Sequence, residues 1–216
     1  MDNSNFSIQK LFGVFANPQT YLNLIYLFLT FPLGLAYFIL LVTGVSLGFG
    51  LLIIWIGLLI LAALLAISWA CVHFERLLAI HLLKVNLPQQ EIRSVPGETI
   101  FHRIRRYLTN PVTWKGLAYL LLKFPLGTIS FVVAVTLLSI SIALVFTPLV
   151  YPFWPVNIVF IRINSLPLAL VAMVIGIFAT PLSLHLLNLI AELWAKFTAV
   201  MLEPEKNETL TANPVG

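Results

Sequence analysis

Few side chains in this sequence are able to do chemistry, and their spacing argues against a catalytic or metal centre. Cys71, His73 and Glu75 alternate at a period of two, which on a helix directs them to different faces. His185 and Glu192 lie seven residues apart and share a helical face, where an ordinary polar contact is the simpler interpretation. HExxH, GxSxG and glycine-rich phosphate motifs are absent. We therefore expect no enzyme, no cofactor and no metal site.

The composition indicates which environment these residues occupy. Of the 216 residues, 60% are hydrophobic and 9% are charged, and the mean hydropathy is +1.01, whereas about a quarter of the residues of a soluble domain are charged. Charged residues are missing from three stretches, each longer than the roughly 20 residues that cross a bilayer: Leu11–Phe74, Phe124–Ile161 and Ile163–Ala191. The sequence therefore predicts an all-α integral membrane protein.

The longest of these stretches is long enough for two spans, so we expect four transmembrane helices. Their predicted ranges are about 20–45, 49–72, 114–146 and 166–190. The glycines between Gly44 and Gly50 predict the turn inside the first pair. Pro148 and the prolines that follow it predict the end of the third span, and Pro167 predicts the start of the fourth.

The distribution of Lys and Arg predicts the orientation. Eight of the twelve basic residues lie between Glu75 and Lys123, whereas the 147–165 connection has only Arg162. By the positive-inside rule the middle segment is cytoplasmic, and four spans then place both termini in the cytoplasm of a multi-pass cell-membrane protein. This bias and anionic lipid account for the net charge of +4, so we do not expect a nucleic-acid partner.

The chain also contains an internal repeat. NPQTYLNLIYLFLTFPLGLAYF (17–38) and NPVTWKGLAYLLLKFPLGTISF (110–131) are identical at 12 of 22 positions without a gap. A duplication predicts two parallel two-span repeats, related by a pseudo-two-fold axis along the membrane normal. The resulting divisions are a first repeat, a cytoplasmic linker, a second repeat and a polar cytoplasmic tail, at 7–84, 85–97, 98–202 and 203–216.

Each repeat begins with a segment that has apolar residues at helical spacing. In the second, Arg103, Arg105 and Arg106 flank the apolar stripe, which predicts an amphipathic helix lying in the inner interface against anionic lipid. The alternative is an amphipathic helix packed on a partner protein.

The duplicated FPLG motif places a proline inside the first and third spans. Pro32 and Pro125 each free the carbonyl four residues earlier, which in lipid must find another partner. Gly34 and Gly127 permit close backbone approach. We expect the two kinks to bend these spans toward each other, either as a static packing feature or as a hinge.

Three charged residues adjoin these spans. Lys123 immediately precedes the second FPLG, and we expect it to snorkel to the cytoplasmic face. The alternatives are a span that begins near Phe124 and a functional charge within the membrane. Glu75 and Arg76 end the second predicted span, with Arg76 as an interface anchor, so no deep acidic residue is expected.

The 147–167 connection is rich in aromatic residues and proline, which predicts a semi-rigid segment against the outer interface. Its aromatic residues form either a plain aromatic belt or a cap that binds amphiphiles of the outer leaflet: Tyr151, Phe153, Trp154 and Phe160.

Two features together, the series NPxTWxxLxYLLLxFPLGxxSF and the helix ending FERLLAIHLL (74–83), resemble the membrane sensor region at the N-terminus of many bacterial histidine kinases. The resemblance covers about residues 10–202 and implies a module of two-component signal transduction. After Leu202 comes only EPEKNETLTANPVG, so we expect a stand-alone sensor that acts on a separate kinase, regulator or membrane complex, with a homodimer as a further expectation. The alternative is a small transporter or an accessory subunit of a larger membrane complex.

The predicted orientation is testable by the labelling of single cysteines in intact cells, on a Cys71→Ser background. We expect a membrane-impermeant maleimide to label positions in 150–160 and to leave positions near Arg103 unlabelled until the membrane is permeabilised. Labelling near Arg103 from outside would contradict the orientation.

Overall fold

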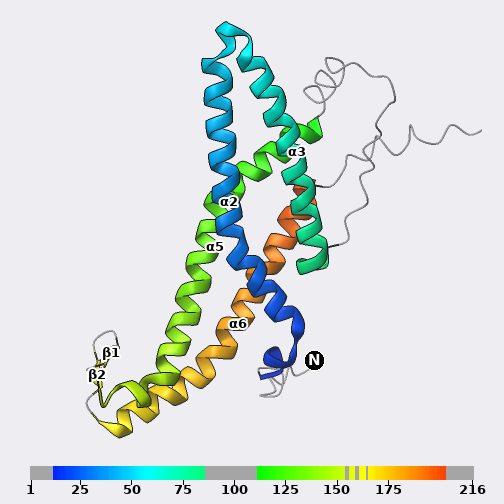
Figure 1. Cartoon of the computed structure of the whole chain (residues 1–216). Helices are drawn as coiled ribbons and strands as arrows, with labels where there is room; N and C mark the ends of the chain where they lie inside the picture. The colour runs from blue at the N-terminus through cyan, green and yellow to red at the C-terminus, as the bar shows by residue number, and fades with distance from the viewer. Residues whose placement is uncertain (1–11, 86–110, 154–155, 159–160, 164, 203–216) are drawn as a thin grey trace, which may run out of the picture. The chain divides into compact units, whose positions relative to one another are not determined.

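A computed structural model describes residues 12–85, 111–153, 156–158, 161–163 and 165–202 (Figure 1). Within these residues, four helices are long and apolar enough to cross a membrane: α2 (Pro18–Gly50), α3 (Ile56–Leu83), α5 (Pro111–Val150) and α6 (Leu166–Leu202). The expected all-α membrane fold with four spans is confirmed. The short elements are η1 (Gly13–Ala16), η2 (Leu52–Ile54) and a hairpin of β1 (Val156–Ile158) and β2 (Ile161–Ile163).

The helices contribute to two compact units. Unit 1 contains residues 1–28 and 129–191, and unit 2 contains residues 29–128 and 192–216. Both units draw on segments from both predicted repeats, and the repeat boundaries stay a prediction from the sequence. The predicted interfacial helix around Arg103, Arg105 and Arg106 lies outside the described residues, and of its first counterpart only the end is described, as η1.

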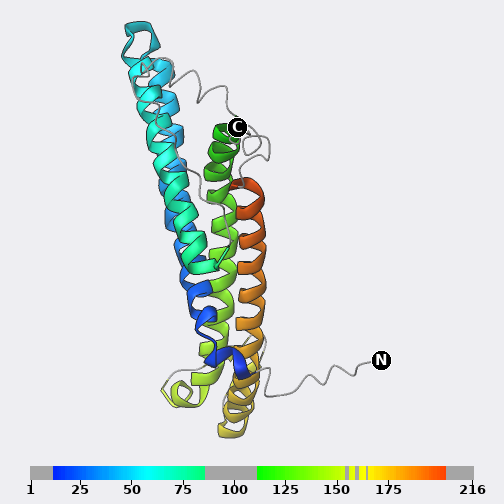
Figure 2. The same cartoon turned by 90° about the vertical axis from the view of Figure 1, so that its right-hand side faces the viewer.

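In unit 2, the second half of α2 and the whole of α3 form an antiparallel hairpin (Figures 1 and 2). The predicted turn between Gly44 and Gly50 is wrong, because α2 continues to Gly50 and the turn follows it. Gly44 and Gly48 instead face α3, where an added Cβ would lie within 2.6 Å of Leu64 and 2.5 Å of Leu61, respectively. Glycines four residues apart on an apolar helix are typical of close helix packing, and this spacing competes with their turn propensity.

The core of unit 2 is built from all four helices. Tyr37 and Leu41 of α2 pack with Leu64 of α3 and with Tyr119 and Leu120 of α5. The end of α6 completes this cluster with Leu202, and partly buried side chains such as Cys71 and Phe197 surround it. These contacts place α3, α5 and the end of α6 around a common centre.

At the FPLG motifs of unit 2, α2 and α5 approach each other at backbone distance. A Cβ added at Gly34 would lie 2.8 Å from the carbonyl oxygen of Lys123, and one added at Gly127 would lie 2.8 Å from that of Thr30. Both prolines lie inside continuous helices. Thr30 and Lys123 are equivalent positions of the two repeats, and the two glycines are another such pair. A local two-fold axis through the contact would produce this reciprocity.

In unit 1, the second half of α5 and the first half of α6 are joined by the β1–β2 hairpin (Figure 1). The strands pair antiparallel, with Asn157 opposite Arg162. Helix α5 continues through Pro148 and ends at Val150, just before Pro152, the second of the prolines that predict its end. Helix α6 begins at Leu166, beside Pro167, as expected for proline in a first helical turn.

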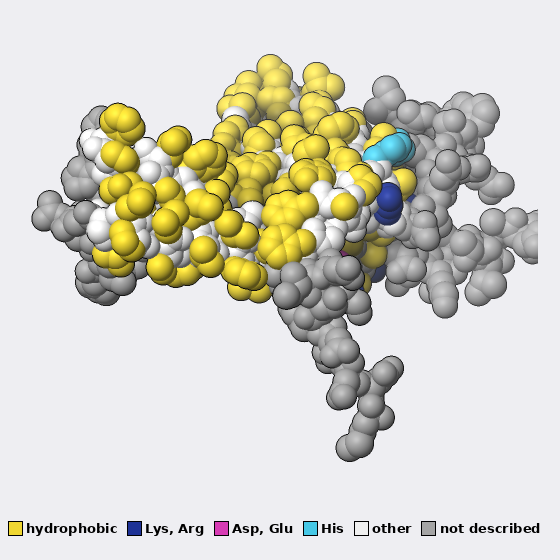
Figure 3. Space-filling view, turned by 90° about the horizontal axis from the view of Figure 1, so that it is seen from below, with side chains coloured by type: hydrophobic (Ala, Val, Ile, Leu, Met, Phe, Trp, Pro, Cys, Tyr) yellow, Lys and Arg dark blue, Asp and Glu magenta, His cyan; other side chains and the backbone are white. Residues whose placement is uncertain are grey.

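The described surface is largely apolar on the face shown in Figure 3. Large exposed hydrophobic side chains occur on all four long helices, for example Ile39, Leu59, Ile129 and Leu182. A helix that is apolar on all sides is typical of a membrane span. Lipid therefore replaces water as the solvent of these helices.

The close approach of α2 and α5 at the FPLG motifs predicts that a larger side chain at either glycine lowers stability. We expect Gly34→Leu and Gly127→Leu each to lower stability by about 1–3 kcal/mol or more, because the added side chain meets backbone that cannot move aside. The double variant should lose less than the sum, since the first leucine already separates the helices. Gly50→Leu is the matched control, because Gly50 has open space around its Cβ position. Thermal unfolding in detergent measures all four variants, and additive losses would contradict a shared contact.

Candidate functional site

Helix α3 is the element that positions the candidate site. It runs from Ile56 to Leu83, about ten residues beyond the predicted end of the second span, because SWACVHFERLLAIHLL contains no glycine or proline to stop it. The left-handed conformation of Lys84 (φ 53°) ends the helix. Glu75 therefore lies within the body of a helix, and its side chain is 0% exposed.

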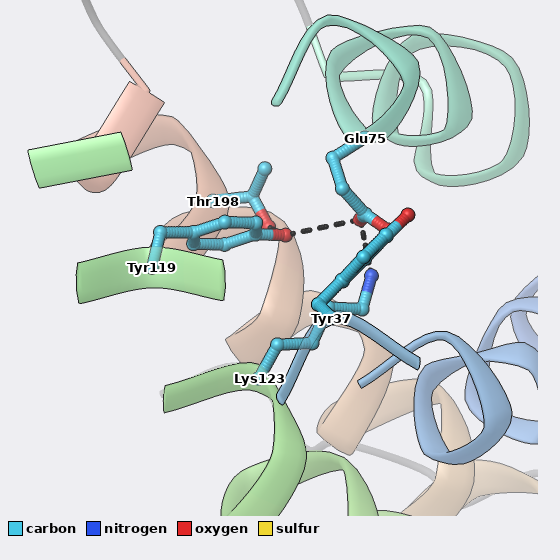
Figure 4. Close-up of polar contacts among 5 residues, drawn as sticks. All are labelled: Tyr37, Glu75, Tyr119, Lys123 and Thr198. Atoms are coloured by element: carbon cyan, nitrogen blue, oxygen red, sulfur yellow. Dashed lines mark hydrogen bonds and ion pairs between the residues drawn. The ribbon is translucent and has the colours of Figure 1, made fainter. Parts of the chain in front are cut away.

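Glu75 lies at the centre of a polar cluster to which all four long helices contribute (Figure 4). Its carboxylate forms an ion pair with Lys123 of α5. The Tyr37 hydroxyl of α2 donates to Oε1 over 2.9 Å, and the Tyr119 hydroxyl of α5 reaches Oε2 at 3.4 Å. Tyr119 in turn lies 3.2 Å from Thr198 Oγ1 of α6. We call these five residues the Glu75 cluster.

Two aromatic rings lie beside the Lys123 ammonium group. The ammonium group lies 5.9 Å from the ring centroids of both Tyr119 and Trp194, within the range of cation–π attraction. Tyr119 is one helical turn before Lys123, so both project from the same face of α5. Removing two charges from water is costly, and the pairing, the hydroxyl donors and the rings offset that cost.

The position of Lys123 corrects the sequence-based expectation. Its side chain is 0% exposed and is paired with Glu75 inside the bundle, which differs from the expected snorkelling to the cytoplasmic face. The sequence predicts Glu75 at the end of the second span, whereas α3 continues to Leu83 and Glu75 is buried as the partner of Lys123. The predicted second span ends at residue 72 because charged residues begin at Glu75. The sequence alone therefore does not predict the pairing of Glu75 with Lys123.

Arg76 has a different role from the predicted interface anchor. It is 6% exposed, and its guanidinium donates to the carbonyl oxygen of Leu202 over 2.8 Å. Leu202 is the last residue of α6, where backbone carbonyls lack helical partners and the helix dipole favours a cation. Two consecutive residues of α3 therefore bind α5 and the end of α6.

Unit 1 contains a second polar network, which the sequence analysis did not predict. The amide of Gln19 donates to Asn23, Asn23 donates to Asn188, and Asn188 donates to Thr20, each over 3.0 Å. Ser141 and Ser183 form a further hydrogen bond, between α5 and α6. Short polar side chains inside apolar spans are the sequence feature that predicts such interhelical bonds.

Of the predicted aromatic cap, Trp154 and Phe160 lie outside the described residues. Tyr151 is half-buried against Ile163, Ala169 and Ala172 of unit 1, and Phe153 is exposed.

The remaining candidates for chemistry are mostly exposed. His73 is exposed whereas Glu75 is buried, and His185 and Glu192 are both exposed. Among the described residues, no group of three His, Cys, Asp or Glu side chains is arranged to hold a metal ion.

These observations define a multi-pass α-helical membrane protein with a buried ionic cluster. Residues 26–202 match the family model described as "Putative sensor", and the chain belongs to this family. The match includes every residue of the Glu75 cluster. No curated protein and no solved structure matches the chain.

The buried ion pair predicts a specific pattern of stability. We expect Lys123→Met or Glu75→Gln alone to lower the free energy of unfolding by about 3–5 kcal/mol, because each leaves a buried group without its partner. The double variant should recover most of this loss, since neither charge remains.

Lys196→Met is the matched control, because Lys196 is exposed on the same part of α6 that provides Thr198. It should change stability by less than about 0.5 kcal/mol. Thermal unfolding in detergent compares the four variants with the wild type. Single variants as stable as the wild type would contradict the buried pair.

Proposed function

We propose that this protein is a membrane sensor that passes a membrane or outer-leaflet signal to a separate cytoplasmic or membrane protein. Its termini and its central basic segment lie in the cytoplasm in this proposal. The family match supports the sensor role, and the Glu75 cluster is the observation that best supports transmission.

The Glu75 cluster is suited to transmission because it links every long helix to α3. Glu75 binds α5 and α2, whereas Arg76 binds the last carbonyl of α6. A buried charge cannot be left unpaired without a large cost, so a displacement of α5 requires α3 to follow or the hydrogen bonds to rearrange. Such a network has discrete arrangements, which is the physical requirement for a two-state element.

The segment that follows α3 in the sequence is the part of the chain that would respond to a movement of α3. Helix α3 ends at Leu83, about two turns after Glu75, and the chain then enters the basic segment 85–110. This segment contains a cluster of arginines, which favours contact with anionic lipid or with an acidic surface of a partner: Arg103, Arg105 and Arg106. Movement of α3 would change how this segment is presented to a kinase, a regulator or another membrane protein.

A small transporter, or an accessory subunit of a larger membrane complex, is the second candidate. The same observation favours it, because ionisable residues within membrane spans often mark ion or substrate pathways. In a transporter, Glu75 and Lys123 would exchange partners with a transported ion.

Deletion of the gene in its native host separates the two candidates. The deletion strain is complemented with the wild type, the Glu75→Gln/Lys123→Met double variant or the Lys196→Met control. Each strain is challenged with an amphiphile that enters the outer leaflet, and its transcriptome and amphiphile uptake are measured.

For a sensor, we expect the wild type and Lys196→Met to restore a transcriptional response that the double variant does not restore. A double variant with a full response would show that the Glu75 cluster does not transmit. Altered uptake with an unaltered transcriptome would favour the transporter.

A further inference from the structure

The turn between α2 and α3 is apolar to a degree unusual for a turn. From residue 47 to residue 67 the sequence has only glycine, aliphatic and aromatic residues. Ile53 is 90% exposed and Trp55 is 81% exposed, and Leu52, Ile54 and Ile56 are exposed too. Turns that face water are instead dominated by Asn, Asp, Ser, Gly and Pro.

Four backbone N–H groups of this turn form hydrogen bonds within the turn and the end of α2. The N–H groups of Leu51, Ile54, Trp55 and Gly57 all donate to carbonyl oxygens of residues 47–52, over 3.0–3.2 Å. Gly57 makes this tight geometry possible, because an added Cβ would lie 2.6 Å from the Leu51 carbonyl carbon. These internal bonds lower the cost of placing the turn in contact with lipid, because each unsatisfied backbone group there costs several kcal/mol.

The conformation and exposure of Trp55 also favour contact of the turn with lipid. It adopts a left-handed conformation (φ 63°, ψ −18°), which costs a non-glycine residue on the order of 1–2 kcal/mol. Its side chain makes little contact with the rest of the chain. A tryptophan at the boundary between acyl chains and headgroups is favourable, which explains a bulky residue at a position suited to glycine.

The length of α3 allows the turn to reach the opposite leaflet. Its 28 residues rise about 42 Å. This exceeds the ~30 Å of the hydrocarbon core. With Lys84 in the headgroup region of one leaflet, the turn therefore lies within the other leaflet.

We propose that the 51–56 turn is a lipid-inserted tip, which places Ile53 and Ile54 among the acyl chains of the leaflet opposite Lys84. Lipid fits the tip better than a protein partner does. A protein interface has a polar rim around its apolar centre, whereas the tip has no polar side chain besides the indole of Trp55. This inference is independent of whether the protein is a sensor or a transporter.

Spin labelling of the full-length protein in lipid nanodiscs tests the tip. A nitroxide is attached to Ile53→Cys on the Cys71→Ser background, and its collision rates with oxygen and with a water-soluble nickel chelate are measured. Ile129→Cys, on the exposed face of α5, is the lipid reference. Asn207→Cys, in the polar C-terminal sequence, is the water reference.

We expect the label at Ile53 to behave like the one at Ile129, with frequent oxygen collisions and few nickel collisions. Frequent nickel collisions, as at Asn207, would place the tip in water and overturn the proposal. Rare collisions with both reagents would show that protein covers the tip, either a second copy or a partner, and would overturn it as well.

Discussion

The rest of this structure depends on the requirement that a charge inside an apolar bundle has a partner. Glu75 and Lys123 are both fully buried, so each is tolerated only in the presence of the other. The tyrosine hydroxyls of α2 and α5 satisfy further acceptor sites of the carboxylate. Within unit 2, these bonds hold together helical segments whose surfaces otherwise contact lipid, where no hydrophobic effect drives helix association.

The FPLG contact and the Glu75 cluster form one arrangement within unit 2. Gly34 packs against the backbone of Lys123 itself, which sets the distance between α2 and α5 at the level of the ion pair. Tyr37 follows Gly34 by three residues on α2, and its hydroxyl reaches Glu75 from there. The close approach that the glycines allow is therefore what lets a side chain of α2 take part in the cluster.

The sequence predicts the elements of this protein better than it predicts their contacts. Long charge-free runs identified all four helices, because hydropathy depends on composition alone. The sequence places the end of the second span too early, since charged residues such as Glu75 and Arg76 usually indicate the membrane interface. Their tolerance in the bundle depends on Lys123 and on the Leu202 carbonyl, which lie far away in sequence. The turn at 44–50 was misassigned because glycine favours both turns and close helix packing.

The two matched FPLG segments differ at the position that carries the charge. Lys123 of the second segment corresponds to Thr30 of the first, which is buried but uncharged. The ion pair with Glu75 therefore involves one of the two matched segments and not the other.

Solid-state NMR in lipid bilayers tests the central claim most directly. With ¹³C at the glutamate Cδ and ¹⁵N at the lysine Nζ, the ion pair predicts a strong dipolar coupling between one glutamate and one lysine. This coupling should disappear in both Glu75→Gln and Lys123→Met and persist in Lys196→Met. Absence of the coupling in the wild type, or its persistence in Glu75→Gln or Lys123→Met, would contradict the account.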